Sequence, residues 1–115
     1  MPRTDSPLEN TRVVLATAPD ARVAERLGRT LVQERLAACV NLLPGVRSIY
    51  RWKGELQEDS EVLLLVKTRK ELLQALVHRL GDLHPYELPE VLALPVTGGS
   101  EPYLRWLRES VEVAE

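Results

Sequence analysis

The chain has 115 residues, of which 44% are hydrophobic and 28% charged, and its formal net charge is −2. This length predicts a single domain, and the composition is that of a globular protein rather than a disordered one. The small negative charge argues against nucleic acid as a partner, because nucleic acid binding usually leaves a basic patch.

The two ends of the chain and its cysteine content predict a compartment. Residues 1–10 are expected to form a disordered lead-in, and residues 11–115 the single domain. The lead-in lacks the apolar segment of a signal peptide, and the longest apolar run, residues 62–66, is too short to cross a bilayer. Cys39 is the one cysteine, so no disulfide can form within the chain. We therefore expect a cytoplasmic protein outside the membrane.

Side-chain periodicity predicts the order strand, helix, strand, strand, helix, strand, helix. These elements are expected over residues 11–17, 21–35, 38–52, 55–68, 69–83, 89–96 and 103–111. Asp20 is a suitable N-cap for the first helix. Pro44-Gly45 predicts a bulge within the first long strand, and Lys53-Gly54 predicts a tight turn between the two long strands. These two strands are expected to form a long hairpin arm that projects from the domain.

This order predicts an α+β, ferredoxin-like βαββαβ fold with an added C-terminal helix, in which the helices cover one face of an antiparallel sheet. The other face is then left open, and the apolar side chains of Leu63 and Leu65 belong to it. Burial of apolar surface is worth about 25 cal/mol per Å², so a large open apolar face predicts an oligomer.

The densest group of titratable residues lies in residues 84–90, with the sequence His-Pro-Tyr-Glu-Leu-Pro-Glu. Its two prolines stiffen the backbone at the entry to the last strand. His84, Tyr86, Glu87 and Glu90 are candidate ligands for a divalent cation, and imidazole suits copper and zinc. The spacing matches none of the usual metal motifs, however, so the alternative is an ordinary solvated corner.

Three other features each have two interpretations. Cys39 is either a soft metal ligand or reactive thiol, or a small buried hydrophobic residue. Lys67 either meets an anion or covers apolar surface with its stem. Tyr50 and Trp52, near the hairpin tip, form either an aromatic wall for a ligand or, as we favour, a protein–protein contact.

Several motifs together form a recognisable pattern of order and spacing, at residues 13–19, 36–41, 44–45, 48–54, 66–68, 84–90 and 94–96. In this pattern the chain resembles the CutA family of divalent-cation tolerance proteins. The resemblance extends over about residues 12–110. It implies a ferredoxin-like subunit in a compact, PII-like homotrimer whose hairpin arms pair with neighbouring subunits, and it implies a link to copper and other divalent ions.

The resemblance also implies a cleft between subunits. The residues that match it are Tyr50, Trp52, Lys67, Tyr86 and Glu90. Some members of the family have a cysteine at the position of Ala16 and a histidine at that of Leu83, and this chain keeps only His84 of that set. We therefore predict His84 and Cys39 as ligands for weak binding of copper or zinc.

The predicted function is that of a homotrimeric, non-catalytic, divalent-cation tolerance protein that binds and responds to a metal ion. The alternative is a PII-like signalling trimer that binds a small anionic metabolite or a partner protein at the subunit interface. An enzyme that uses Lys67, Tyr86 or Glu90 as acid, base or nucleophile is the least favoured interpretation.

Overall fold

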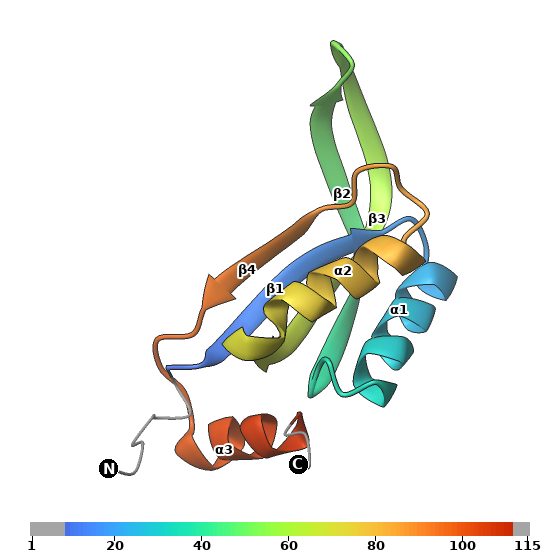
Figure 1. Cartoon of the computed structure of the whole chain (residues 1–115). Helices are drawn as coiled ribbons and strands as arrows, with labels where there is room; N and C mark the ends of the chain where they lie inside the picture. The colour runs from blue at the N-terminus through green and yellow to red at the C-terminus, as the bar shows by residue number, and fades with distance from the viewer. Residues whose placement is uncertain (1–8, 112–115) are drawn as a thin grey trace.

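A computed structural model describes residues 9–111, so residues 1–8 of the expected lead-in lie outside the described part of the chain. Four strands and three α-helices follow one another within it (Figure 1). They are β1 (Thr11–Ala18), α1 (Ala21–Gln33), β2 (Cys39–Trp52), β3 (Glu55–Arg69), α2 (Leu73–Leu83), β4 (Val91–Pro95) and α3 (Glu101–Ser110), with a short 3-10 turn at Lys70–Leu72. The predicted order of elements is confirmed.

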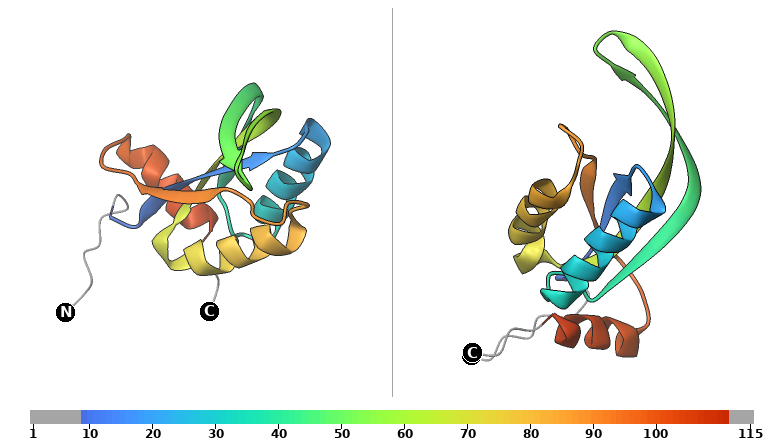
Figure 2. Two further views of the ribbon diagram at one scale, coloured as in Figure 1. Left: turned by 90° about the horizontal axis from the view of Figure 1, so that it is seen from above. Right: turned by 90° about the vertical axis from the view of Figure 1, so that its right-hand side faces the viewer.

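The strands form one antiparallel sheet in the order β2-β3-β1-β4. This order places the first and third strands side by side in the centre, as the ferredoxin-like βαββαβ pattern requires. Helices α1 and α2 lie against the same face of the sheet (Figures 1 and 2). The predicted α+β fold is therefore confirmed, including its helical layer.

Strands β2 and β3 extend well beyond the rest of the sheet as a hairpin arm, which makes the molecule 55 × 26 × 22 Å (Figure 1). The arm turns at Lys53 and Gly54, whose φ angles are +51° and +81°. Two successive residues with positive φ give a turn whose twist matches that of the flanking strands. The register of β2 shifts between Leu43 and Val46, so the predicted bulge is confirmed as well.

Alternate residues of the central strands build the core. Val14 pairs with Val66 and Ala16 with Leu64, and all four side chains are fully buried on the helical face of the sheet. The helices contribute Leu27, Leu31, Leu76 and Leu80, which are also fully buried. The core is therefore aliphatic, as a chain without phenylalanine requires.

The opposite face of the sheet is formed by the alternate side chains of each strand, which point away from the helices. Leu15 pairs with Leu65 on one side and with Leu92 on the other, and Val13 pairs with Leu94. Cross-strand partners share a face, so these apolar side chains lie together away from the helices. Leu92 remains 57% exposed and Leu94 46% exposed in the single chain. We call this the open face.

Helix α3 packs at the end of the sheet remote from the arm (Figure 1). It buries Leu104 and Leu107, and Val111, which follows its last residue, is buried as well. Within residues 9–111, every helix falls short of the length and apolar character needed to span a bilayer.

Some local details differ from the sequence prediction. Helix α1 ends at Gln33, two residues earlier than expected, because Arg35 adopts a left-handed conformation with φ of +59°. Helix α3 begins at Glu101, two residues before its predicted start, with Pro102 in its first turn. Val77, which periodicity places in the apolar stripe of α2, is exposed, because Leu76 and Leu80 fill the space toward the sheet.

Candidate functional site at the base of the hairpin arm

The predicted site begins where α2 ends. His84 follows the last residue of α2 in extended conformation, and its backbone N–H still donates to the carbonyl of Leu80 at 2.9 Å. Arg26 of α1 donates to the neighbouring carbonyl of Leu83 at 2.9 Å. The helix end is thus tied to α1, which holds the start of the following loop in a fixed place.

The His84 side chain is almost fully buried, at 8% exposure, and both of its ring nitrogens are hydrogen bonded. Nε2 lies 2.6 Å from the carbonyl oxygen of Thr17, and the backbone N–H of Tyr86 donates to Nδ1 at 3.1 Å. A carbonyl only accepts and a backbone N–H only donates, so the imidazole is neutral with its proton on Nε2. His84 therefore anchors the loop to the end of β1.

Tyr86 continues this network to β3. Its ring lies 4.6 Å from the His84 ring, centroid to centroid, and its hydroxyl donates to Glu61 Oε2 at 2.8 Å. Glu61 is 8% exposed, so the hydroxyl is a partner for a nearly buried carboxylate. Burial, together with this hydrogen bond, raises the pKa of Tyr86 above its usual range.

A second tyrosine–carboxylate pair lies further along the arm. The hydroxyl of Tyr50 on β2 donates to Asp59 on β3, and this hydrogen bond raises the pKa of the Tyr50 phenol. Asp59 and Glu61, the two acceptors, lie two residues apart on β3 and so project from the same side of that strand. Two phenols, Tyr50 on the arm and Tyr86 on the adjoining loop, are therefore each hydrogen bonded to a carboxylate of β3.

Lys67 and Cys39 form a separate group on the open face. They are register partners on β3 and β2, and the Lys67 ammonium donates to the side-chain oxygen of Asn41. The Cys39 thiol is half-buried and lies 4.0 Å from the same oxygen. Six residues separate Lys67 from Glu61 along β3, which corresponds to roughly 20 Å. A single chain thus keeps this group apart from the tyrosine pairs.

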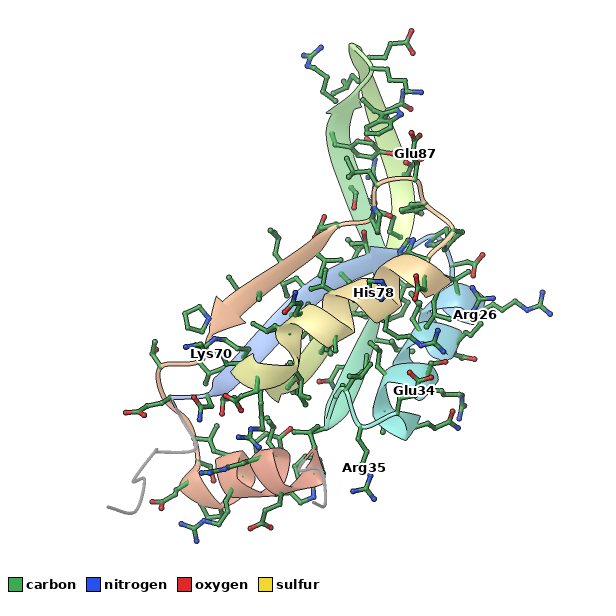
Figure 3. All side chains as sticks on the ribbon, in the orientation of Figure 1. Arg26, Glu34, Arg35, Lys70, His78 and Glu87 are labelled. Carbon is green, nitrogen blue, oxygen red and sulfur yellow. The ribbon has the colours of Figure 1, made fainter. Side chains whose placement is uncertain are left out.

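The other predicted residues are exposed. Trp52 is the last residue of β2, at the tip of the arm, where the ammonium of Lys53 lies 5.7 Å from its ring centroid. Glu90 lies immediately before β4, and Glu87 lies on the loop beside the arm (Figure 3). The arm and loop therefore present Tyr50 and Tyr86 together, while Trp52 and Lys67 lie at opposite ends of the hairpin.

The predicted metal ligands do not meet in one chain. His84 contacts Thr17, which pairs with Leu63, whereas Cys39 pairs with Lys67 four residues further along β3, roughly 13 Å away. Among residues 9–111 there is no group of three or more His, Cys, Asp or Glu side chains arranged to hold a metal ion. A metal at His84 would have to replace one of its two hydrogen bonds, so this pair does not form a ready cation site.

Sequence reasoning missed the acceptors that organise this site. Asp59 and Glu61 interrupt the alternation of β3 with carboxylates just before its apolar stretch, and this pattern is the signal that points to them. Asn41, next but one to Cys39, carries no comparable signal. The role of the Thr17 carbonyl could not be predicted from the sequence, because every residue type presents the same backbone oxygen.

Comparisons with known proteins agree on one family. The family model described as CutA1 divalent ion tolerance protein matches residues 12–110. The divalent-cation tolerance protein CutA of Thermus thermophilus is 54% identical over 98 residues, which cover 85% of this chain and 95% of that protein. The protein is therefore a member of the CutA1 family, as the sequence motifs predict.

Two further relatives show how much of each chain the similarity covers. The chloroplastic protein CutA of Arabidopsis thaliana is 50% identical over 98 residues, covering 85% of this chain but 54% of that protein, so the chain spans about half the length of this relative. The crystal structure of CutA1 from Oryza sativa superposes with a TM-score of 0.89 at 43% identity, covering 95% of this chain and 100% of the rice chain. These likenesses confirm the fold. The description of the family and the name of the Thermus thermophilus relative favour a divalent-cation function over the signalling alternative.

Proposed function

We propose that this protein contributes to tolerance of divalent cations by binding such an ion, without catalysing a reaction, as an assembly of three identical chains in the cytoplasm. Membership of the CutA1 family carries the proposal, because relatives covering nearly all of this chain are named for divalent-cation tolerance. Copper and zinc are the proposed ions, since imidazole and thiol ligands suit them.

The open face supports the proposed assembly. Leu92 and Leu94 form, with Leu15 and Leu65, an apolar surface of the kind that oligomers bury. Strands β2 and β4 lie at the edges of the sheet, where their unpaired backbone groups are available to pair with another chain. A second copy of the chain is the partner that would cover both features.

The assembly also bears on the predicted cleft. Lys67 lies far from Tyr86 in one chain, so a pocket that contains both residues needs Lys67 from a neighbouring copy. We propose that such an interface cleft is lined by the five residues predicted for it. They are Tyr50, Trp52, Lys67, Tyr86 and Glu90. The sequence predicts His84 and Cys39 as metal ligands. Because they lie apart and both ring nitrogens of His84 are hydrogen bonded, an ion at either residue would also need a carboxylate of a neighbouring chain.

Calorimetric titration with Zn²⁺ and Cu²⁺ tests the metal half of this proposal. We expect saturable binding to the untagged protein and, if His84 is a ligand, weaker binding after His84→Ala. Because His84 also anchors the loop, circular dichroism must show that this variant is folded. A folded protein that gives no saturable heat with either ion would refute cation binding.

A further inference from the structure

The chain has two histidines, and their surroundings differ sharply. His84 is nearly buried, and both of its ring nitrogens are hydrogen bonded. The His78 side chain is 80% exposed on the outer side of α2, away from the sheet (Figure 3). The His78 imidazole is therefore accessible to a cation, whereas both ring nitrogens of His84 are already hydrogen bonded.

A carboxylate accompanies His78 at chelating distance. Asp82 lies one helical turn later, and its Oδ2 is 3.5 Å from His78 Nδ1. Zinc binds nitrogen and oxygen ligands at about 2.1 Å, and tetrahedral geometry then places two ligand atoms about 3.4 Å apart. The observed spacing thus admits one ion bound to both side chains, with little movement of either.

The surroundings leave room for the ion and its water ligands. Ala75 and Gly81, on the same side of α2, are exposed and small, and a side chain added at Gly81 would meet no atom within 4 Å. The Asp82 side chain is itself 53% exposed. The site is therefore open to solvent, from which water would supply the remaining ligands.

The local charges also allow a cation here. Asp82 lies in the last turn of α2, where the unpaired carbonyls of a helix favour positive charge. Arg79 is the nearby positive group, and its guanidinium is bonded to both carboxylate oxygens of Glu34, at 2.9 and 2.8 Å. The positive charge of Arg79 is thus balanced by Glu34 of α1 rather than by Asp82 alone.

We propose that His78 and Asp82 form a two-residue chelate for a divalent cation of the zinc type, completed by water, on the outer face of α2. This inference rests on the proposed function and assigns the ion to a different imidazole. An open, two-ligand site of this kind exchanges its ion readily, which suits a protein that responds to cation level rather than one that stores a metal permanently.

Zinc titration of the full, untagged chain tests the assignment. His78→Ala should lower zinc affinity about tenfold, and Asp82→Asn should lower it about threefold, because each removes one of two protein ligands. Asp82→His should raise affinity about tenfold by supplying a second imidazole at the same spacing. Glu25→Gln, which removes an exposed carboxylate from α1, is the matched charge control and should change nothing.

Ring signals in ¹H–¹⁵N NMR spectra give an independent readout. Zinc should shift the His78 imidazole and leave the His84 imidazole unchanged. Zinc binding that persists unaltered in folded His78→Ala protein would overturn the chelate while leaving the proposed cation function in place. An unaltered chain that binds neither zinc nor copper at concentrations up to about 1 mM would overturn both.

Discussion

The chain of contacts from Thr17 through His84 and Tyr86 to Glu61 shows what single residues contribute at the base of the arm. The side chains of His84, Tyr86 and Glu61 are each hydrogen bonded, so a loop rich in titratable groups is held in place by satisfied hydrogen bonds. The prediction that His84 is important follows from the composition of its segment and from the prolines that flank it. Its neutral state does not, because Thr17 lies 67 residues away and contributes only a backbone oxygen.

Removal of the Tyr86 hydroxyl should destabilise the protein. Tyr86→Phe leaves the nearly buried carboxylate of Glu61 without its donor, and loss of a hydrogen bond to a charged group costs about 1.5–3 kcal/mol. Urea unfolding monitored by circular dichroism measures this loss. Tyr103→Phe is the matched control, since Tyr103 is exposed on α3, and its effect should stay within about 0.5 kcal/mol. Equal effects of the two changes would contradict the proposed role of the hydroxyl.

The same phenol should make stability depend on alkaline pH. Because the pKa of Tyr86 is raised in the fold, its protonated form is favoured there, and the stability it contributes is fully present below the unfolded pKa of about 10. As pH rises above that value, the unfolded chain loses the proton first, so the contribution declines. The difference in unfolding free energy between the unaltered chain and Tyr86→Phe should therefore be constant from pH 7 to about 9 and shrink above about 10. A difference that grows with pH would contradict this sign.

At the scale of elements, strand periodicity and turn residues predict most of the fold, because local sequence determines them. Lys53-Gly54 and Pro44-Gly45 mark the turn and the bulge of the arm correctly, and both glycines have positive φ. Helix ends are less predictable. Arg35 ends α1 in a left-handed conformation, which its residue type does not predict, since arginine is a good helix former.

The hairpin turn offers a test of this local control. Gly54→Ala places a Cβ at φ of +81°, so it should lower stability by about 1 kcal/mol. Gly98→Ala is the control, because a Cβ added at Gly98 would meet no atom within 4 Å and the residue has no positive φ, so it should be neutral or slightly stabilising. Thermal melting of the two variants gives the comparison. If both melt at the same temperature, the turn geometry does not limit stability.

At the scale of the whole molecule, a single chain covers only one of the two apolar faces of its sheet. A single chain buries a complete aliphatic core between its helices and one face of the sheet, yet leaves a second apolar face uncovered and an arm that extends past its own domain (Figure 2). Alternation within the strands predicts both faces from the sequence. The identity of what covers the second face is not encoded in any local pattern, since it depends on surfaces that come from several elements.

A charge on the open face should break the proposed assembly. Leu94→Glu places a carboxylate among Val13 and its neighbours at a residue that is 46% exposed in the single chain, so it harms the monomer little but would bury an unpaired charge in an interface. Val77→Glu, at 44% exposure on α2, is the matched control. In sedimentation equilibrium the unaltered chain and Val77→Glu should give three times the 13.0 kDa of one chain, and Leu94→Glu should give smaller species. A stable 13.0 kDa species of the unaltered chain at micromolar concentration would mean that the open face is solvated, and the interface cleft would have to be abandoned with it.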